Sequence, residues 1–365
     1  ILSTDSDGVP LSDTDTVAIT VSSVNDAPVN TVPGAQTVNE DTALNITGVS
    51  VTDVDGNLAT SQISVGDGTL TVSLTGGATI SAGANGSSTL TLSGTETQIN
   101  AALATISYQG DSNFNGSDTF TILSTDSDGV PLSDTDTVAI TVSPVNDAPV
   151  NTVPGAQTVD EDTALNITGV SVTDVDGNLA TSQISVGDGT LTVSLTGGAT
   201  ISAGANGSST LTLSGTETQI NAALATISYQ GDLNFNGSDT FTILSTDSAG
   251  VPLSDTDTVA ITVSPVNDAP VNTVPGAQTV NEDTALNITG VSVTDVDGNL
   301  ATSQISVGDG TLTVSLTGGA TISAGANGSS TLTLSGTETQ INAALATISY
   351  QGDLNFNGSD TFTIL

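Results

Sequence analysis

The sequence lacks lysine, arginine and histidine, and its 39 aspartates and glutamates give a formal net charge of −39. No salt bridge between side chains can therefore form within the chain, and the carboxylates repel one another unless dissolved cations neutralise them. Nucleic acids and anionic membranes carry the same sign of charge, so a polyanion of this kind is a poor partner for either. We therefore expect no nucleic-acid partner.

Cysteine, methionine and tryptophan are also absent, and there are only three tyrosines and six phenylalanines. Without cysteine, the chain can form no disulfide and no thiolate metal site. No stretch approaches the length of apolar sequence that a membrane-spanning helix needs, so we expect no membrane insertion in this segment. Hydrophobic residues nevertheless make up 36% of the chain and are strongly patterned, which argues against disorder.

One segment, Val-Asn-Asp-Ala-Pro-Val-Asn-Thr-Val-Pro-Gly-Ala-Gln-Thr-Val, begins at residues 24, 145 and 266, which gives a period of 121 residues. A period of this length corresponds to a whole domain, because solenoid repeats are much shorter. The sequence therefore predicts four parts: the C-terminal part of a preceding repeat over 1–28, complete repeats over 29–149 and 150–270, and a repeat without its last strand over 271–365.

The two ends of the chain fall within a repeat. Residues 1–6 recur at 122–127 and 243–248, and the chain stops inside the same segment. One interpretation is that the sequence is a slice of a longer array. The other is that residues 11–22 of a like chain supply the missing last strand by strand addition, which would build a fibre.

Apolar residues alternate with serine and threonine through most of each repeat, as in 69–74, 89–92, 118–122 and 136–142. This period of two, with many β-branched residues, predicts an all-β fold of tandem antiparallel β-sandwich repeats of the immunoglobulin-like kind. The alternation changes phase at Gly48, which predicts a bulge. In residues 95–106, a Thr95–Gln98 capping box precedes apolar residues at helical spacing, which predicts one short helix per repeat.

The loop at 111–118 places acidic or amide side chains at alternate positions before and after a glycine, at Asp111, Asn113, Asn115 and Asp118. Calcium prefers six to eight oxygen ligands, and alternate loop positions can converge on one ion. An Asx turn without metal is the alternative interpretation. The pattern recurs in the next two repeats at Asp232, Asn234, Asn236, Asp239, Asp353, Asn355, Asn357 and Asp360.

Three further acidic groups are candidate ligands, with solvated turn carboxylates as the alternative. The Asp-x-Asp turn supplies Asp53, Asp55, Asp174, Asp176, Asp295 and Asp297. The Glu-Asp pair near the start of each repeat supplies Glu40, Asp41, Glu161, Asp162, Glu282 and Asp283. The segment between repeats supplies Asp26, Asp147 and Asp268. Together, linker and edge acids can form a cation site at the joint between domains.

The stretch Asn-Phe-Asn-Gly-Ser-Asp-Thr-Phe-Thr-Ile, followed by Asp-Thr-Val-Ala-Ile-Thr-Val-Ser-Pro-Val-Asn-Asp-Ala-Pro-Val, resembles the cadherin-like tandem repeats of giant bacterial RTX-type surface adhesins. The stretch beginning Val-Ser-Val-Thr-Asp-Val-Asp-Gly-Asn is similar to the Asp-x-Asp segment of cadherins. The resemblance covers the whole repeat. It implies a secreted β-sandwich array that calcium stiffens and that is held at a cell surface.

By residue, the resemblance implies that each joint takes ligands from one repeat, the linker and the next repeat. These sets are Glu40, Asp147, Asp174 and Asp176 at one joint, and Glu161, Asp268, Asp295 and Asp297 at the next. The linker has one acid fewer than in cadherins, and the absence of arginine removes their Asp-Arg-Glu motif. We therefore expect one or two ions per joint, fewer than three.

These features favour an extracellular structural role: a calcium-stiffened extender of a surface adhesin that projects a distal binding module in adhesion or biofilm formation. The alternative is a subunit of a self-assembling extracellular fibre. An enzyme is disfavoured, because only aspartate, glutamate and tyrosine could act in acid–base chemistry and we find no catalytic residues. Carbohydrate or ice binding stays open, although sugar sites usually have aromatic platforms. The expected partners are neighbouring repeats and like chains.

Overall fold

The computed structural model describes all 365 residues and divides into two compact units, residues 1–147 and residues 148–365. Three separate hydrophobic cores lie within the predicted repeats, between Ile46 and Val142, between Ile167 and Val263, and between Ile288 and Tyr350. The chain is all-β apart from three short helices, as the sequence predicts. The exact repeat boundaries remain a prediction.

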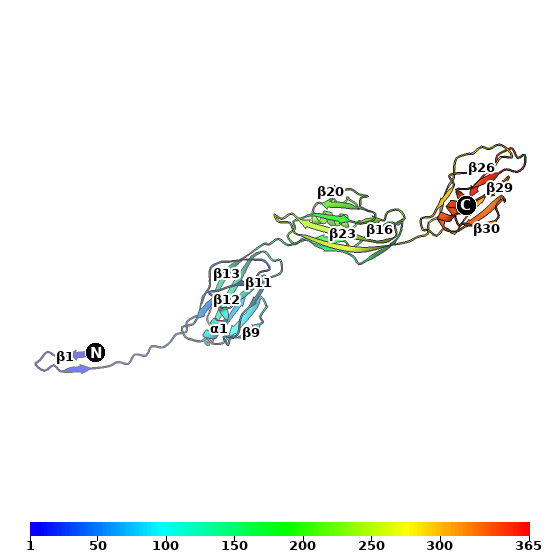
Figure 1. The fold of residues 1–365 in the computed structure, drawn as a ribbon. Coiled ribbons are helices and arrows are strands. Elements are labelled where there is room, and N and C mark those ends of the chain that lie inside the picture. The colour runs from blue at the N-terminus through cyan, green and yellow to red at the C-terminus, as the bar shows by residue number, and fades with distance from the viewer. The chain divides into compact units, whose positions relative to one another are not determined.

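The strands of the first repeat form separate β-sheets (Figure 1), and side chains from these sheets pack together in the first core. A six-stranded sheet has the order β4-β13-β12-β7-β10-β9, a three-stranded sheet the order β5-β11-β8, and β3 pairs with β6. The elements are β3 (Val29–Thr31), β4 (Gln36–Asn39), β5 (Leu44–Asn45), β6 (Ser50–Thr52), β7 (Leu58–Ser64), β8 (Gly68–Thr71), β9 (Thr79–Gly83), β10 (Thr89–Ser93), α1 (Glu96–Leu103), β11 (Ser107–Gly110), β12 (Gly116–Asp126) and β13 (Ser133–Ser143).

The second repeat has the same topology, because its sequence is nearly identical. Its sheets have the orders β15-β24-β23-β18-β21-β20, β16-β22-β19 and β14-β17. The elements are β14 (Val150–Thr152), β15 (Gln157–Asp160), β16 (Leu165–Asn166), β17 (Ser171–Thr173), β18 (Leu179–Ser185), β19 (Thr190–Thr192), β20 (Thr200–Gly204), β21 (Thr210–Ser214), α2 (Glu217–Leu224), β22 (Ser228–Gln230), β23 (Gly237–Asp247) and β24 (Ser254–Ser264).

In the third repeat, the large sheet has four strands, in the order β30-β31-β28-β33. The given residues end at Leu365, before the segment that would correspond to β13 and β24, and residues 278–281, which correspond to β15, form no strand. The elements are β25 (Val271–Thr273), β26 (Leu286–Asn287), β27 (Ser292–Thr294), β28 (Thr302–Ser306), β29 (Thr311–Thr313), β30 (Thr321–Gly325), β31 (Thr331–Ser335), α3 (Glu338–Leu345), β32 (Ser349–Gln351) and β33 (Thr363–Ile364).

The predicted helix is confirmed, and α1 lies at one end of the first repeat (Figure 1). Thr95 accepts a hydrogen bond from the backbone N–H of Gln98, whose side chain accepts one from the backbone N–H of Thr95. Ile99 and Leu103 are buried in the core. None of the three helices is long and apolar enough to cross a membrane.

The structure differs from the predicted strands in two places. At Gly48, which has a φ of 82°, the chain does not bulge but leaves one sheet for another, since β5 pairs with β11 whereas β6 pairs with β3. In addition, β4 pairs with β13 in parallel, so the sandwich is not wholly antiparallel. Both features depend on partners distant in sequence, which a local alternation cannot reveal.

Residues 1–28 contribute nothing to the three cores. They contain the strands β1 (Leu2–Thr4) and β2 (Ser12–Thr14), which form an antiparallel hairpin. Leu2, Val17 and Ile19 are largely exposed.

Candidate metal centre

Glu161 is held at the end of the parallel strand pair in the second repeat. The backbone N–H of Glu161 donates to the carbonyl of Ser264, directly beyond the paired residues Asp160 and Ser264. The Glu161 side chain is 4% exposed; one carboxylate oxygen accepts the N–H of Val266, and the other accepts the side-chain amide of Asn236 at 3.1 Å. The parallel strand therefore places this carboxylate where the chain leaves the sandwich.

Asp268 lies in the linker that follows β24. Its backbone N–H donates to Oδ2 of Asp297 at 2.6 Å. Its own Oδ2 is buried and accepts no hydrogen bond. Burying a carboxylate oxygen without a hydrogen-bond donor costs free energy, and a bound cation would offset that cost.

The Asp-x-Asp turn of the third repeat supplies the remaining carboxylates. The N–H of Asp297 donates to Oδ1 of Asp295, and the N–H of Gly298 donates to the Asp295 carbonyl, which closes a tight turn. Asp295 is 8% exposed. Its backbone N–H donates to Glu338, the first residue of α3, at 3.0 Å. These bonds fix the direction of both aspartates.

Carboxylate oxygens of Glu161, Asp268 and Asp297 all lie within 4.8 Å of one another. Burial raises the pKa of the Asp268 carboxyl, and the neighbouring carboxylates, Asp297 foremost, raise it further. The chain has no lysine, arginine or histidine to offset this repulsion. Gathering three like charges without a cation is unfavourable.

The residues present fit a hard divalent cation. All of the donors are oxygens, which calcium and magnesium prefer over nitrogen and sulfur. The orphaned Asp268 Oδ2 supplies an oxygen that no hydrogen bond occupies. The spread of oxygens is also compatible with calcium, whose oxygen ligands stand about 2.3–2.6 Å from the ion. The cluster therefore unites three residues that the sequence assigned to this joint, Glu161, Asp268 and Asp297, within unit 148–365, and Asp295 accepts the N–H of Asp297 in the turn beside it.

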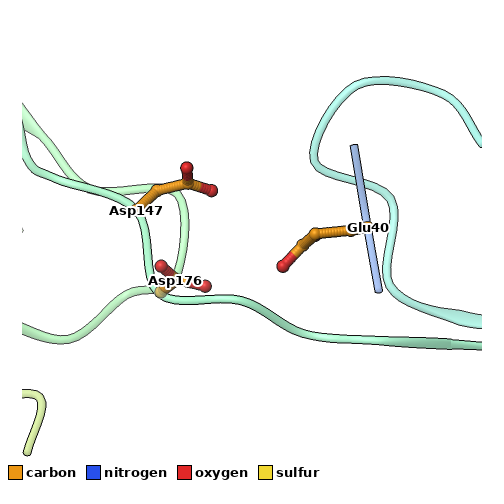
Figure 2. A group of neighbouring side chains, drawn as sticks. All are labelled: Glu40, Asp147 and Asp176. Carbon is orange, nitrogen blue, oxygen red and sulfur yellow. The ribbon is translucent and has the colours of Figure 1, made fainter. Parts of the chain in front are cut away.

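The corresponding residues one repeat earlier are Glu40, Asp147 and Asp176, drawn in Figure 2. Within unit 1–147, the Glu40 side chain points toward Asp147 (Figure 2). Glu40 is 4% exposed and accepts the N–H of Val145, as Glu161 accepts that of Val266. The local framework of the glutamate is therefore the same in both repeats.

Asp26 repeats the linker arrangement at the start of the first complete repeat. Its N–H donates to Oδ2 of Asp55 at 2.7 Å, as that of Asp268 donates to Asp297. Asp53 is buried and accepts the N–H groups of Asp55 and Gly56. The Asp-x-Asp turn, which has the same sequence in both places, therefore forms the same hydrogen bond to the linker in the first and third repeats.

The Asp-Asn loop of 232–236 lies beside the Glu-Asp pair. The N–H of Asn234 donates to the Asp162 carboxylate at 2.9 Å, and both residues have a positive φ. The same bond joins Asn113 to Asp41 and Asn355 to Asp283. Because Asn236 also donates to Glu161, this loop positions the carboxylate of the candidate centre.

Asp239, which the sequence grouped with this loop, is engaged elsewhere. It is 6% exposed and accepts the N–H groups of Gly187, Asp188 and Thr240. Asp118 has the equivalent bonds in the first repeat. Burial and the neighbouring Asp239 raise the pKa of Tyr229, whose hydroxyl donates to the Asp188 carbonyl. A separate ion bound by Asp232, Asn234, Asn236 and Asp239 stays a prediction.

Two residues of α3 hold the backbone next to the candidate centre, and the sequence analysis did not predict a role for either. Glu338 holds the backbone of Asp295, and Asn342 accepts the N–H of Val293 while donating to its carbonyl. The sequence signal was limited to an acid in the first helical turn and an amide one turn later. Nothing in the spacing indicates that both face the strand before the Asp-x-Asp turn.

The chain matches one family model in each of its three repeats, over residues 33–135, 157–255 and 276–365; the model describes the GEX2, or Protein GAMETE EXPRESSED 2, domain. A search of curated proteins finds no match.

The solved structures that match this chain include extracellular cadherin domains. Protocadherin Gamma B2 extracellular cadherin domains 1–5 match with 16% identity and a TM-score of 0.36, over 96% of this chain and 58% of that one. Human CDH23 EC21–23 matches with 15% identity and a TM-score of 0.35, over 90% of this chain and 91% of that one. This chain thus spans less than two thirds of the first structure. By its three family matches, the chain belongs to the GAMETE EXPRESSED 2 domain family.

Proposed function

We propose that the chain is an extracellular structural array whose joints bind calcium. The observation that carries the proposal is the convergence of Glu161, Asp268 and Asp297 within 4.8 Å in a chain without basic side chains. One bound cation supplies the positive charge that the cluster lacks. Since its ligands come from the second repeat, the linker and the third repeat, binding would restrict the linker.

The near-identity of the repeats supports a spacer role. Residues 29–149 and 150–270 differ at only three positions. Each added repeat therefore lengthens the array without adding a binding surface that the other repeats lack. The sequence resemblance to bacterial surface adhesins supports the more specific role of an extender that projects a distal binding module in adhesion or biofilm formation. Its length would then be set by the number of repeats, each of which adds strands of defined span.

Thermal unfolding with and without calcium tests the proposal. We expect the chain to unfold at a higher temperature in calcium than in excess EDTA, because a ligand that binds only the folded state stabilises it. Magnesium at the same concentration controls for ionic screening, and sodium chloride for ionic strength. Equal unfolding temperatures in calcium and EDTA would reject calcium as the ion of these joints.

A further inference from the structure

The first strand of the second repeat is tied to the last two strands by a buried asparagine. Asn151 lies in β14, two residues after the linker proline Pro149, and is 7% exposed. Its backbone N–H and its side-chain amide donate to the carboxylate and the carbonyl of Asp255 in β24, at 2.8 and 2.9 Å. Its side-chain oxygen accepts the hydroxyl of Ser245 in β23 at 2.6 Å. Both polar atoms of the Asn151 side chain are therefore bonded to the strands that end the repeat.

The same two parts of the repeat are joined again by a parallel strand pair. β15 pairs with β24 over four residues, the last of which is Asp160 opposite Ser264. Directly beyond, the N–H of Glu161 donates to the Ser264 carbonyl, and the Glu161 carboxylate accepts the N–H of Val266. The chain that enters the repeat is therefore bonded to the chain that leaves it at three successive places: at Asn151, along β15 and at Glu161.

The direction of these strands decides how the bonds are loaded when the array is under tension. The first repeat pulls on the second through the linker before Val150, and the third repeat pulls through the linker that begins near Val266. Tension therefore acts on the N-terminal end of β15 and on the C-terminal end of β24. Because the two strands are parallel, these pulls slide one strand along the other. The hydrogen bonds are then loaded together in shear, whereas an antiparallel pair pulled apart from one end loses its bonds one after another.

Most of the second repeat lies outside this path of tension. The residues between Glu161 and Asp255 include α2 and most of the second core, and tension reaches them only after the bonds to β24 have broken. The first repeat has the same arrangement, because Asn30 is bonded to Asp134 and Ser124, and β4 is parallel to β13. The same set of bonds therefore recurs in both repeats.

We propose that the array bears mechanical tension, and that each of these two repeats resists it through a clamp between its first and last strands. In the second repeat, the clamp comprises Asn151 with Asp255, β15 with β24, and Glu161 with Val266. All of its bonds lie within the protein, so the clamp acts without a bound ion and goes beyond the calcium-binding role. Forced unfolding is governed by the rate of unfolding, so the clamp raises the unfolding force more than it raises the equilibrium stability.

Single-molecule stretching of the full chain in EDTA tests the proposal, with handles attached through a cysteine added at each end. The chain has no cysteine of its own, so the attachment is specific. We expect a distinct unfolding event for each of the first two repeats. Each event should lengthen the chain by up to about 400 Å, because a repeat of 121 residues extends to about 3.3 Å per residue. A wild-type chain that lengthens gradually, without distinct events, would overturn the proposal.

Two asparagine substitutions in the second repeat separate resistance to tension from ordinary stability. Asn151→Ala removes the bonds to β23 and β24, and it should shift one unfolding event to a lower force than that of the unaltered first repeat in the same molecule. Asn221→Ala is the matched control, because it also removes two hydrogen bonds, but these join α2 to β17 outside the path of tension. Chemical denaturation measures the loss of unfolding free energy in each variant. For the same loss, Asn151→Ala should lower the force much more, and an equal fall in both variants would contradict the clamp.

Proline substitutions in β15 test the parallel pair separately, whether or not Asn151→Ala folds. Backbone groups of successive residues in a strand point to opposite sides, and the Glu161 N–H points to β24. The N–H of Val159 therefore also points to β24, whereas that of Thr158 points away, at the open edge of the sheet. Val159→Pro removes a bond of the clamp and should lower the force of one event, whereas Thr158→Pro removes none and should leave both events unchanged.

Val159→Ala controls for the half-buried Val159 side chain, because alanine keeps the backbone N–H. It should unfold at a higher force than Val159→Pro. If Val159→Pro unfolds at the same force as Thr158→Pro, or at the same force as Val159→Ala, the parallel pair does not carry the tension and the proposal fails.

Discussion

At the scale of single residues, the centre depends on Asp268, the linker acid with an unsatisfied oxygen. Replacing it with asparagine removes one ligand charge and one source of repulsion. We therefore expect Asp268→Asn to weaken calcium binding at this joint by about tenfold or more, as loss of a ligand interaction commonly does. In EDTA, the same variant should unfold at a higher temperature than the wild type, because the repulsion is relieved. Calorimetric titration and thermal unfolding measure the two effects.

Asp188→Asn is the matched control for Asp268→Asn, because it removes the same charge from an exposed turn of the same repeat. It should leave calcium affinity unchanged within about twofold. If both variants weaken binding equally, net charge and not the Glu161–Asp268–Asp297 geometry is responsible.

The raised pKa of Asp268 gives a pH dependence of defined sign. A carboxyl whose pKa is higher in the folded state than in the unfolded state stabilises the fold when protonated, and this contribution is lost as the pH rises through the folded pKa. Without calcium, the stability difference between Asp268→Asn and the wild type should therefore be largest at neutral pH and should shrink as the pH falls toward about 4. Denaturant unfolding in EDTA at several pH values measures this. A difference that grows on acidification would contradict the electrostatic explanation.

At the scale of elements, α2 is tied to β17 through one side chain. Asn221 donates to the Val172 carbonyl at 2.7 Å and accepts the Val172 N–H at 2.8 Å. Asn221→Ala leaves both buried backbone groups unpaired, so we expect the second repeat to lose about 1–3 kcal/mol of unfolding free energy. Chemical denaturation should then show one of the three repeats unfolding earlier than the others.

Thr218→Ala is the control for Asn221→Ala, since Thr218 is an exposed residue of the same helix. Alanine has the higher helix propensity, so this variant should be neutral or slightly stabilising. Equal loss in both variants would mean that the helix is sensitive to any change and that the side-chain bridge to Val172 has no special role.

The strands and the helix could be predicted because their signals are local. Alternation of apolar residues marks β12 and β13, and Thr95 with Gln98 marks the start of α1. The parallel pairing of β4 and the change of sheet at Gly48 could not, because each depends on a partner about a hundred or about sixty residues away. The polar run Thr60-Ser61-Gln62 likewise gives no sign that the Ser61 hydroxyl is buried against Ser124.

The sequence predicts which types of residue form the candidate centre, but it predicts only in part which of these residues lie together. Carboxylates near glycine and proline indicate turns that can hold a hard cation. Asp239 shows the limit of that reasoning, since the same pattern also suits a side chain that accepts three backbone N–H groups. Which acids converge depends on the β15–β24 pairing that places Glu161 beside the linker.

At the scale of the whole molecule, calcium should act at the joint more than in the cores. Hydrogen exchange resolved by segment measures this. We expect calcium to slow exchange at Val266 and Asp268, whose N–H groups are bonded to Glu161 and Asp297. Core amides such as that of Ile243 should change little, because their protection comes from the sheet. Uniform slowing through all segments would point to nonspecific screening of the net charge.

The most direct test of calcium at the joint is a diffraction experiment on crystals grown in calcium, with anomalous scattering used to identify the ion. We expect an anomalous peak between Glu161, Asp268 and Asp297, with carboxylate oxygens about 2.3–2.6 Å away. Well-ordered carboxylates that surround only water at saturating calcium would contradict a calcium-bound joint.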